Sequence, residues 1–242
     1  MRRRALIGSS ILGLSTPRLA SPALATTRGV IEIVTVDQRP YAIAQGPEPG
    51  FVLTLSAELF RMVGLQVVFR FMPWPEAEMR AQARTGVAIT PIRRTSVWDG
   101  RYIWALTLFD DPSAFGTLRA AAPDTGEEAR RLAQITVIAN SPQEAYLRGH
   151  GFSRLLPVDS LREAAAALRE GRATAWFAAV PELHAGLNAI QIGHPIFESP
   201  VWLALNRATN DIMLPALHDA YAALEGDGSI YQMLRPFLGR PA

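Results

Sequence analysis

The sequence predicts an α/β protein of two lobes with a ligand cleft between them. β-branched runs alternate with stretches of helical periodicity, and this alternation pauses near residues 122–130 before it starts again. The chain has 242 residues and is 49% hydrophobic, so it can bury one large core or two smaller ones. Because each repeat has roughly 100 residues, a common domain size, we expect two lobes.

The first repeat alternates three strands with two helices. The run VIEIVTV is β-branched and predicts a buried strand, whereas Phe51, Leu55 and Leu59 recur every four residues and predict a helix. Strand, helix and strand in succession favour parallel pairing through right-handed crossovers. The expected strands are 30–36, 65–74 and 87–92, and the expected helices are 50–64 and 75–86.

The second repeat resumes the same alternation. Its first helix has a complete start signal, with Ser141 as N-cap, Pro142 at the first helical position and Glu144 three residues after the cap. Two more helices are expected at the end of the chain. The expected strands are 135–140, 154–158, 173–180 and 199–206, and the expected helices are 141–149, 159–171, 181–187, 211–225 and 229–238.

The first 25 residues have the three parts of a secretory signal peptide. Three arginines (residues 2–4) precede a short apolar stretch, and small residues that end at Ala25 form a cleavage site. The apolar stretch is too short to anchor the chain in a bilayer. We therefore expect cleavage near Ala25 and a soluble periplasmic protein, exported by the general secretory route or, given the adjacent arginines, by the twin-arginine route.

Composition argues against several classes of protein. All 24 basic residues are arginines, and 20 of them remain beside 22 acidic residues once the signal peptide is removed. No basic block is present, so no nucleic-acid partner is expected. The chain lacks cysteine and lysine, and its four histidines show no metal-binding spacing. We therefore expect no disulfide, no metal, no cofactor and no catalytic residue, that is, a protein that is not an enzyme.

Several phrases occur in a characteristic order: PY after the first predicted strand, then GFVLTLSAELFRMVG, RTSVWDGRYIW, NSPQEAYLRGHGF and YAALEGDGSIYQMLRPFL. In order and spacing they resemble the bacterial extracellular solute-binding proteins of family 3, the amino-acid-type receptors of ABC importers. The resemblance covers nearly the whole chain after the signal peptide. It implies a type II-like periplasmic binding protein fold in which the chain crosses between lobes twice. Lobe 1 would comprise residues 27–108 and 201–242, and lobe 2 residues 109–200.

The resemblance also implies a function. A periplasmic substrate-binding protein of this kind captures a small polar solute, here one that carries a carboxylate (amino-acid-like or an organic acid), and delivers it to the membrane permease of an ABC importer. It would act as a monomer. Two alternatives share the fold: a partner or sensor protein with impaired binding, and a periplasmic dehydratase-type enzyme.

Ligands bind to such folds where loops leave the carboxyl ends of the strands. The loops in question are Asp37–Tyr41, Pro73–Pro75, Pro91–Trp98, Ala139–Gln143 and Ala178–Pro181. They supply the candidate ligand-binding residues Tyr41, Trp74, Arg93, Trp98, Ser141 and Gln143.

Three of these candidates have a specific chemical rationale. The guanidinium of Arg93 offers paired donors to a carboxylate. The flat face of Trp74 suits an aliphatic stem, a ring or a cation. Ser141 begins a helix, whose amino terminus favours an anion. The alternatives are packing between the lobes for Trp74 and simple capping for Ser141.

Two positions depart from the family pattern. Trp98 occupies the place of the arginine that holds the ligand carboxylate in the amino-acid receptors, and Ala179 that of the aspartate that holds the amino group. We therefore expect Arg93 to take over the carboxylate while Arg94 points away. The alternative is that these arginines lie in solvent or pair with Asp99.

Overall fold

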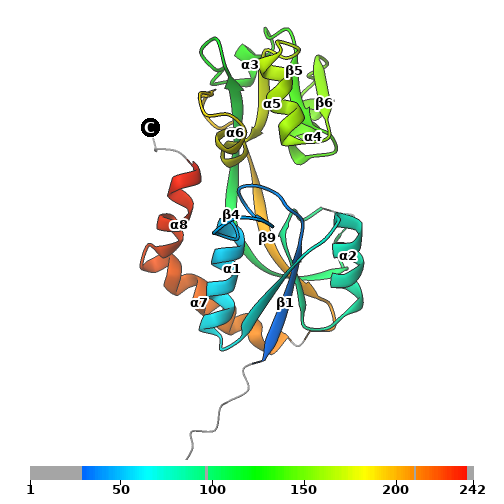
Figure 1. Cartoon of the computed structure of the whole chain (residues 1–242), viewed down its shortest axis with the longest axis vertical. Coiled ribbons are helices and arrows are strands. Elements are labelled where there is room, and N and C mark those ends of the chain that lie inside the picture. The colour runs from blue at the N-terminus through cyan, green and yellow to red at the C-terminus, as the bar shows by residue number, and fades with distance from the viewer. Residues whose placement is uncertain (1–28, 96–97, 210, 239–242) are drawn as a thin grey trace, which may run out of the picture.

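Two lobes joined by two long antiparallel strands make up the computed structural model (Figure 1). The structure describes residues 29–95, 98–209 and 211–238, so the predicted signal peptide lies outside the described residues. The joining strands are β4 (Tyr102–Thr117) and β9 (Phe197–Asn206). Their pairing runs from Tyr102 opposite Asn206 to Ser113 opposite Phe197, so each strand belongs to both lobes.

Lobe 1 is a sheet with helices on both faces. β1 pairs in parallel with β2 and with β3, as the strand–helix–strand pattern predicts, and β3 pairs antiparallel with β9. The stripe predicted from Phe51, Leu55 and Leu59 is buried, and the two closing helices pack into the same core. The elements are β1 (Val30–Thr35), α1 (Phe51–Met62), β2 (Gln66–Phe71), α2 (Trp74–Ala83), β3 (Val87–Ile92), η1 (Asp211–Met213), α7 (Leu214–Gly226) and α8 (Ser229–Leu238).

Lobe 2 repeats this arrangement on a smaller scale. β5 pairs in parallel with β6 and β7, and β4 pairs antiparallel with β7 and β8. No helix of the described residues is long and apolar enough to cross a membrane. The elements are α3 (Gly126–Ala129), β5 (Ile135–Ile138), α4 (Pro142–Gly149), β6 (Leu155–Val158), α5 (Leu161–Arg169), β7 (Ala175–Ala179), α6 (Val180–Gly186) and β8 (Gln191–Ile192).

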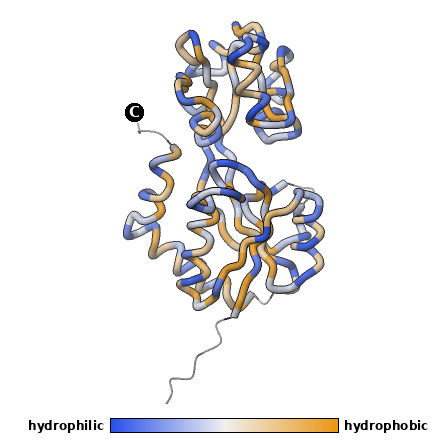
Figure 2. Tube along the Cα trace, in the orientation of Figure 1, coloured by the Kyte–Doolittle hydropathy of each residue, from blue (hydrophilic) through white to orange (hydrophobic). Residues whose placement is uncertain are grey.

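A single sheet therefore runs through both lobes, in the order β2-β1-β3-β9-β4-β7-β5-β6, with β8 beside β4. Each lobe nevertheless has its own hydrophobic clusters, and Ala179 at the end of β7, in lobe 2, packs into the large cluster of lobe 1. One large cluster surrounds α1 in lobe 1, and Trp176 and Phe177 on β7 belong to two clusters in lobe 2. Figure 2 shows this distribution, with hydrophobic strands inside lobe 1 and more hydrophilic chain where the lobes meet.

The long strand β4 is the largest element that the sequence pattern does not predict, and the short elements α3 and β8 are not predicted either. The centre of β4 contains Asp110, Asp111 and Pro112, residues that normally argue against a strand interior. The strand also contains two shifts of register against β9, near Trp104 and near Thr107, which break the alternation of buried and exposed positions. A strand that serves two cores in succession cannot show one simple period.

Gly50 precedes α1 with a backbone φ of 96°, and a Cβ placed on it would lie 2.5 Å from the carbonyl oxygen of Tyr41. That carbonyl accepts a hydrogen bond from the Val52 N–H, so it cannot move away without loss. Gly50→Ala should lower the free energy of unfolding by about 1–3 kcal/mol, measured by urea denaturation. Gly64→Ala is the matched control, because the φ of Gly64 is also positive, at 82°, but a Cβ placed on it would meet no other residue within 4 Å. Equal losses in the two variants would contradict a steric role for Gly50.

Candidate functional site

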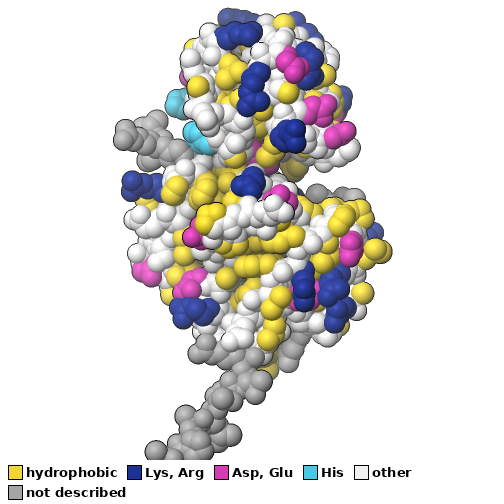
Figure 3. All heavy atoms as spheres, viewed as in Figure 1, with side chains coloured by type: hydrophobic (Ala, Val, Ile, Leu, Met, Phe, Trp, Pro, Cys, Tyr) yellow, Lys and Arg dark blue, Asp and Glu magenta, His cyan; other side chains and the backbone are white. Residues whose placement is uncertain are grey.

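A cleft of about 1060 Å³ lies between the lobes. It lies slightly above the range of roughly 300–1,000 Å³ that is typical of small-molecule sites, whereas four smaller pockets of the described residues measure about 230–410 Å³. One wall comes from the loops after β1 and β3 and the start of α2, and the other from the loops after β5 and β6. The first residues of β9 complete the lining. Figure 3 shows the narrow waist at which the lobes meet.

Four of the six predicted ligand-binding residues line this cleft: Trp74, Arg93, Trp98 and Ser141. The other two lie behind its walls. Tyr41 is fully buried and its hydroxyl donates to Asp111 Oδ2 at 2.7 Å, whereas the Gln143 amide donates to Ser113 Oγ at 3.0 Å. In this arrangement both side chains support the strand β4 from behind. Contact of any of the six with a ligand stays a prediction.

Arg93 lines the cleft with a side chain that is 19% exposed. Its Nη2 is 2.5 Å from Asp111 Oδ2, and its Nη1 donates to the Ser199 carbonyl oxygen at 3.2 Å. Asp111 is completely buried, and burial raises the pKa of its carboxyl although Arg93 and Tyr41 oppose the shift. Because a guanidinium has five N–H donors, these contacts fix the position of Arg93 and leave donors free.

Arg94 has a different environment. Its Nε donates to Asp99 Oδ1 at 2.8 Å, and both side chains are about half exposed. Its guanidinium also lies 5.6 Å and 5.7 Å from the ring centres of Trp104 and Trp202. The pair with Asp99 is therefore observed for Arg94, whereas the partner of Arg93 is Asp111.

The aromatic residues that follow the two arginines form a chain of rings within lobe 1. Trp98 lies 6.2 Å from Tyr102, Tyr102 lies 5.8 Å from Trp104, and Trp104 lies 5.7 Å from Trp202. Tyr102 belongs to the buried core cluster beside α2, and Trp98, Trp104 and Trp202 are partly buried and pack against that cluster. Most of these aromatics thus support the cleft wall, and Trp98 is the member that lines the cleft.

Ser141 caps α4, as predicted. Its Oγ accepts from the Glu144 N–H at 3.1 Å and donates to the Ile138 carbonyl at 2.7 Å. In return the Glu144 carboxylate accepts from the Asn140 N–H at 2.7 Å, and this bond and Arg148 lower the pKa of Glu144. A carboxylate of the chain itself therefore occupies the helix start, which makes this end of α4 less suitable for an external anion.

Two acidic residues of the cleft lining are not among the ligand-binding residues predicted from the sequence. Asp159 follows β6, and Glu198 lies on β9 where the chain returns to lobe 1. The rule that ligands bind at the carboxyl ends of strands applies equally to the loop after β6, so it could have identified Asp159. Glu198 lies near the start of β9, which is longer than predicted, and no loop pattern marks it.

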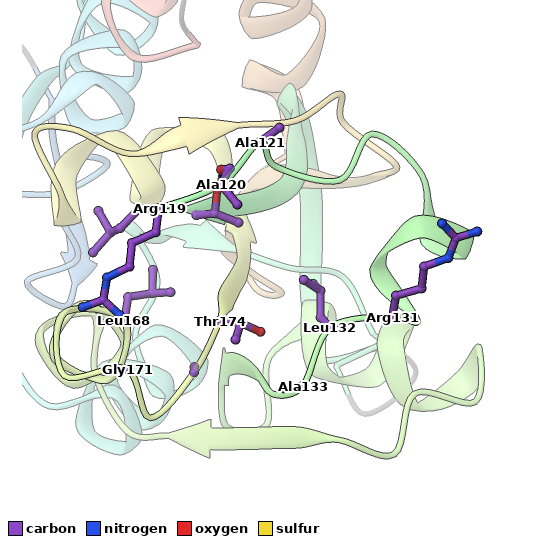
Figure 4. Close-up of a pocket in the computed structure, with 12 residues that line it drawn as sticks. Arg119, Ala120, Ala121, Arg131, Leu132, Ala133, Leu168, Gly171 and Thr174 are labelled. Carbon is purple, nitrogen blue, oxygen red and sulfur yellow. Dashed lines mark hydrogen bonds between the residues drawn. The ribbon is translucent and has the colours of Figure 1, made fainter.

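A second pocket of about 350 Å³ lies in lobe 2 and shares no lining residue with the cleft (Figure 4). Leu132, Leu168 and Thr174 surround it, and Arg119 extends along one side toward α5. The Arg119 Nη2 donates to the Arg169 carbonyl at 3.4 Å, whereas the Arg131 side chain points away from the other lining residues.

No family model and no curated protein matches the chain. Solved structures do match it, at 14–16% sequence identity over 88% of this chain. An ancestral amino acid-binding protein, described as a precursor of cyclohexadienyl dehydratase, has a TM-score of 0.70 with 96% of its chain covered. A histidine kinase sensor domain with similarity to periplasmic binding proteins has a TM-score of 0.69 with 97% covered. The substrate-binding protein of an amino acid ABC transporter has a TM-score of 0.65 with 100% covered.

These likenesses, together with the two crossing strands and the cleft between the lobes, show that the chain has the two-lobed fold of the periplasmic binding proteins.

Proposed function

We propose that the chain is a periplasmic substrate-binding protein that captures a small polar, amino-acid-like solute in the cleft and presents it to the permease of an ABC importer. The observation that supports this most is the charge pattern of the cleft. Arg93 and Arg94 lie on the wall of lobe 1, whereas Asp159 lies on lobe 2 and Glu198 on the strand between them. A zwitterion matches this pattern, because its two charged groups would each meet an opposite charge.

In this proposal the free donors of Arg93 bind the carboxylate, and Asp159 or Glu198 binds the amino group. Trp74 and Trp98 flank the remaining stem of the solute. The two charged groups of the family's clamp, which this chain lacks at Trp98 and Ala179, would thus be supplied from other positions. Ala179 is completely buried and packs into the core cluster of lobe 1, so it has no access to a ligand.

The proposal includes cleavage near Ala25, action as a monomer, and lobes bounded at residues 108/109 and 200/201. These boundaries fall within β4 and β9, whose residues Phe109 and Val201 are paired. A ligand that contacts both lobes would favour a closed arrangement about these strands.

A thermal-shift screen against amino acids, organic acids and amines tests the proposal. A ligand at 100 times its dissociation constant should stabilise the protein by about 2.7 kcal/mol. For a chain of this size the melting temperature would rise by roughly 5–10 °C. Small-angle scattering with the best ligand should show a smaller radius of gyration, because closure brings the lobes together. A ligand that binds without compaction would contradict capture by both lobes.

The main alternative is a partner or sensor protein, and the loss of the family's charged clamp at Trp98 and Ala179 favours it. It predicts that no solute of the screen shifts the melting temperature, although the protein is folded. A dehydratase-type enzyme on this fold instead predicts turnover of a cyclic acid.

A further inference from the structure

Three ionisable side chains interact electrostatically where the lobes meet: Arg93 after β3, Asp111 on β4 and Glu182 on α6, which we call the hinge cluster. We propose that the hinge cluster is a proton-dependent latch, in which protonated Glu182 holds α6 against lobe 1 and ionised Glu182 loosens this contact. The inference concerns the unliganded protein and does not depend on the proposed function.

The cluster connects the crossing strands to lobe 1. Asp111 on β4 and Ser199 on β9 are paired across the two strands, and Arg93 binds the carboxylate of one and the carbonyl of the other. Tyr41, from the loop before α1, donates to the same carboxylate oxygen as Arg93. Residues of lobe 1 thus bind both crossing strands at the paired positions Asp111 and Ser199, next to Pro112.

Glu182 connects the cluster to lobe 2. It lies on the short helix α6, is only 8% exposed, and accepts a hydrogen bond from the Gln38 amide of lobe 1 at 3.4 Å. α6 also packs against α8, which belongs to lobe 1. The contact of Glu182 with Gln38 is therefore a direct polar link between the lobes beside the hinge.

The charges of the cluster balance only when it holds a proton. Two buried carboxylates face one guanidinium, and a buried charge without a partner is costly. Burial, then the charge of Asp111, raise the pKa of Glu182 to about 7, against opposing effects from Arg93, Gln38 and the backbone of Ala179. Tyr41 stays neutral, since burial and the two carboxylates raise its pKa. Because the carboxyls of Asp111 and Glu182 interact, they titrate as a pair rather than as two independent groups.

The hydrogen bonds of Asp111 give a second reason to expect a proton in the hinge cluster. Its Oδ2 accepts from both Tyr41 and Arg93, but its buried Oδ1 has no hydrogen-bond partner among the described residues. A proton on Glu182 would add one donor to a cluster that has an unused acceptor. Loss of that proton would leave two like charges in a buried space.

The sign of the pH dependence follows from this arrangement. Because the latched form raises the pKa of Glu182, it binds the proton more tightly than a form in which Glu182 meets water. The latch is therefore fully formed below the ordinary carboxyl pKa and weakens as the pH rises through about 7. Each unit by which the pKa differs between the two forms shifts their ratio by about tenfold.

The chain has no cysteine, so spin labels can be placed at will. We would label Met79→Cys on α2 and Ser153→Cys in lobe 2, both exposed, and measure their distance distribution in unliganded protein at pH 5.5 and pH 8.5. The distribution should shift between these values with a midpoint near 7. Glu182→Gln, which keeps an acceptor for Gln38 but cannot ionise, should retain the low-pH distribution throughout. Glu127→Gln, at a highly exposed acid of lobe 2, is the matched control and should shift like the parent.

A pH-independent distribution in the parent, or a shift in Glu182→Gln equal to that of the parent, would overturn the latch. Infrared spectroscopy of the unsubstituted protein gives a measurement that needs no variant. The band of a protonated buried carboxyl should be present at pH 5.5 and lost near pH 7, and its absence at pH 5.5 would equally refute the proposal.

Discussion

Replacing Arg93 with alanine should lower the free energy of unfolding by about 3–5 kcal/mol, because it leaves the carboxylate of Asp111 buried without its cation. The Asp111 side chain is fully buried, and Arg93 is its charged partner at 2.5 Å. A loss of this size is a large part of the stability of an ordinary domain, which is about 5–15 kcal/mol. Urea denaturation at neutral pH measures it.

Two variants control this experiment. Arg94→Ala removes an arginine from the next position, but its pair with Asp99 is half exposed, so the loss should be at most about 1 kcal/mol. Adding Asp111→Asn to Arg93→Ala should restore part of the stability, because the unpaired charge of Asp111 is then removed. If the double variant were less stable than Arg93→Ala alone, the buried carboxylate would not be the cause.

Arg93→Lys should weaken a carboxylate-bearing ligand about thirtyfold, or ~2 kcal/mol, with the fold retained. Lysine keeps a positive charge beside Asp111 but lacks the forked donors that bind a carboxylate in pairs. The ligand would be the solute that gives the largest shift in the thermal screen, and calorimetry would measure its affinity. This prediction depends on Arg93 having donors free for a ligand after those used by Asp111 and Ser199.

An esterified analogue of the same solute serves as the control ligand. It lacks the negative charge, so the parent and Arg93→Lys should bind it equally. Arg94→Ala should weaken the free acid by at most about fivefold, as expected for an exposed charge. A larger effect from Arg94→Ala than from Arg93→Lys would assign the carboxylate to Arg94.

Much of the fold follows from local patterns. The strands β1, β3 and β5 and the helices α1, α4 and α5 lie where periodicity and capping residues predict them, because each lies within a single lobe and keeps one pattern of burial along its length. The crossing strand β4 is not predicted, because it does not lie within a single lobe. It passes from one core to another through Asp111 and Pro112, and no local pattern describes such a segment.

Part of the candidate site could also be predicted from local patterns, and part could not. The rule about strand ends identified Trp74, Arg93, Trp98 and Ser141 as cleft residues, since the end of a strand is visible in sequence. It could not separate Tyr41 and Gln143, whose side chains turn behind the walls toward β4. Side-chain direction within a loop depends on partners far along the chain.

The sequence by itself determined an α/β chain of two repeats, with strand-end loops that bring two arginines and several aromatics to one edge. Only the tertiary structure decided how the arginines are used. Arg93 pairs with Asp111, 18 residues away, because the crossing strand β4 carries Asp111 into the space between the lobes, whereas the nearby Asp99 pairs with Arg94. Local periodicity reports which face of an element is buried, whereas the choice between Asp99 and Asp111 as the partner of each arginine depends on distances that exist only in the folded chain.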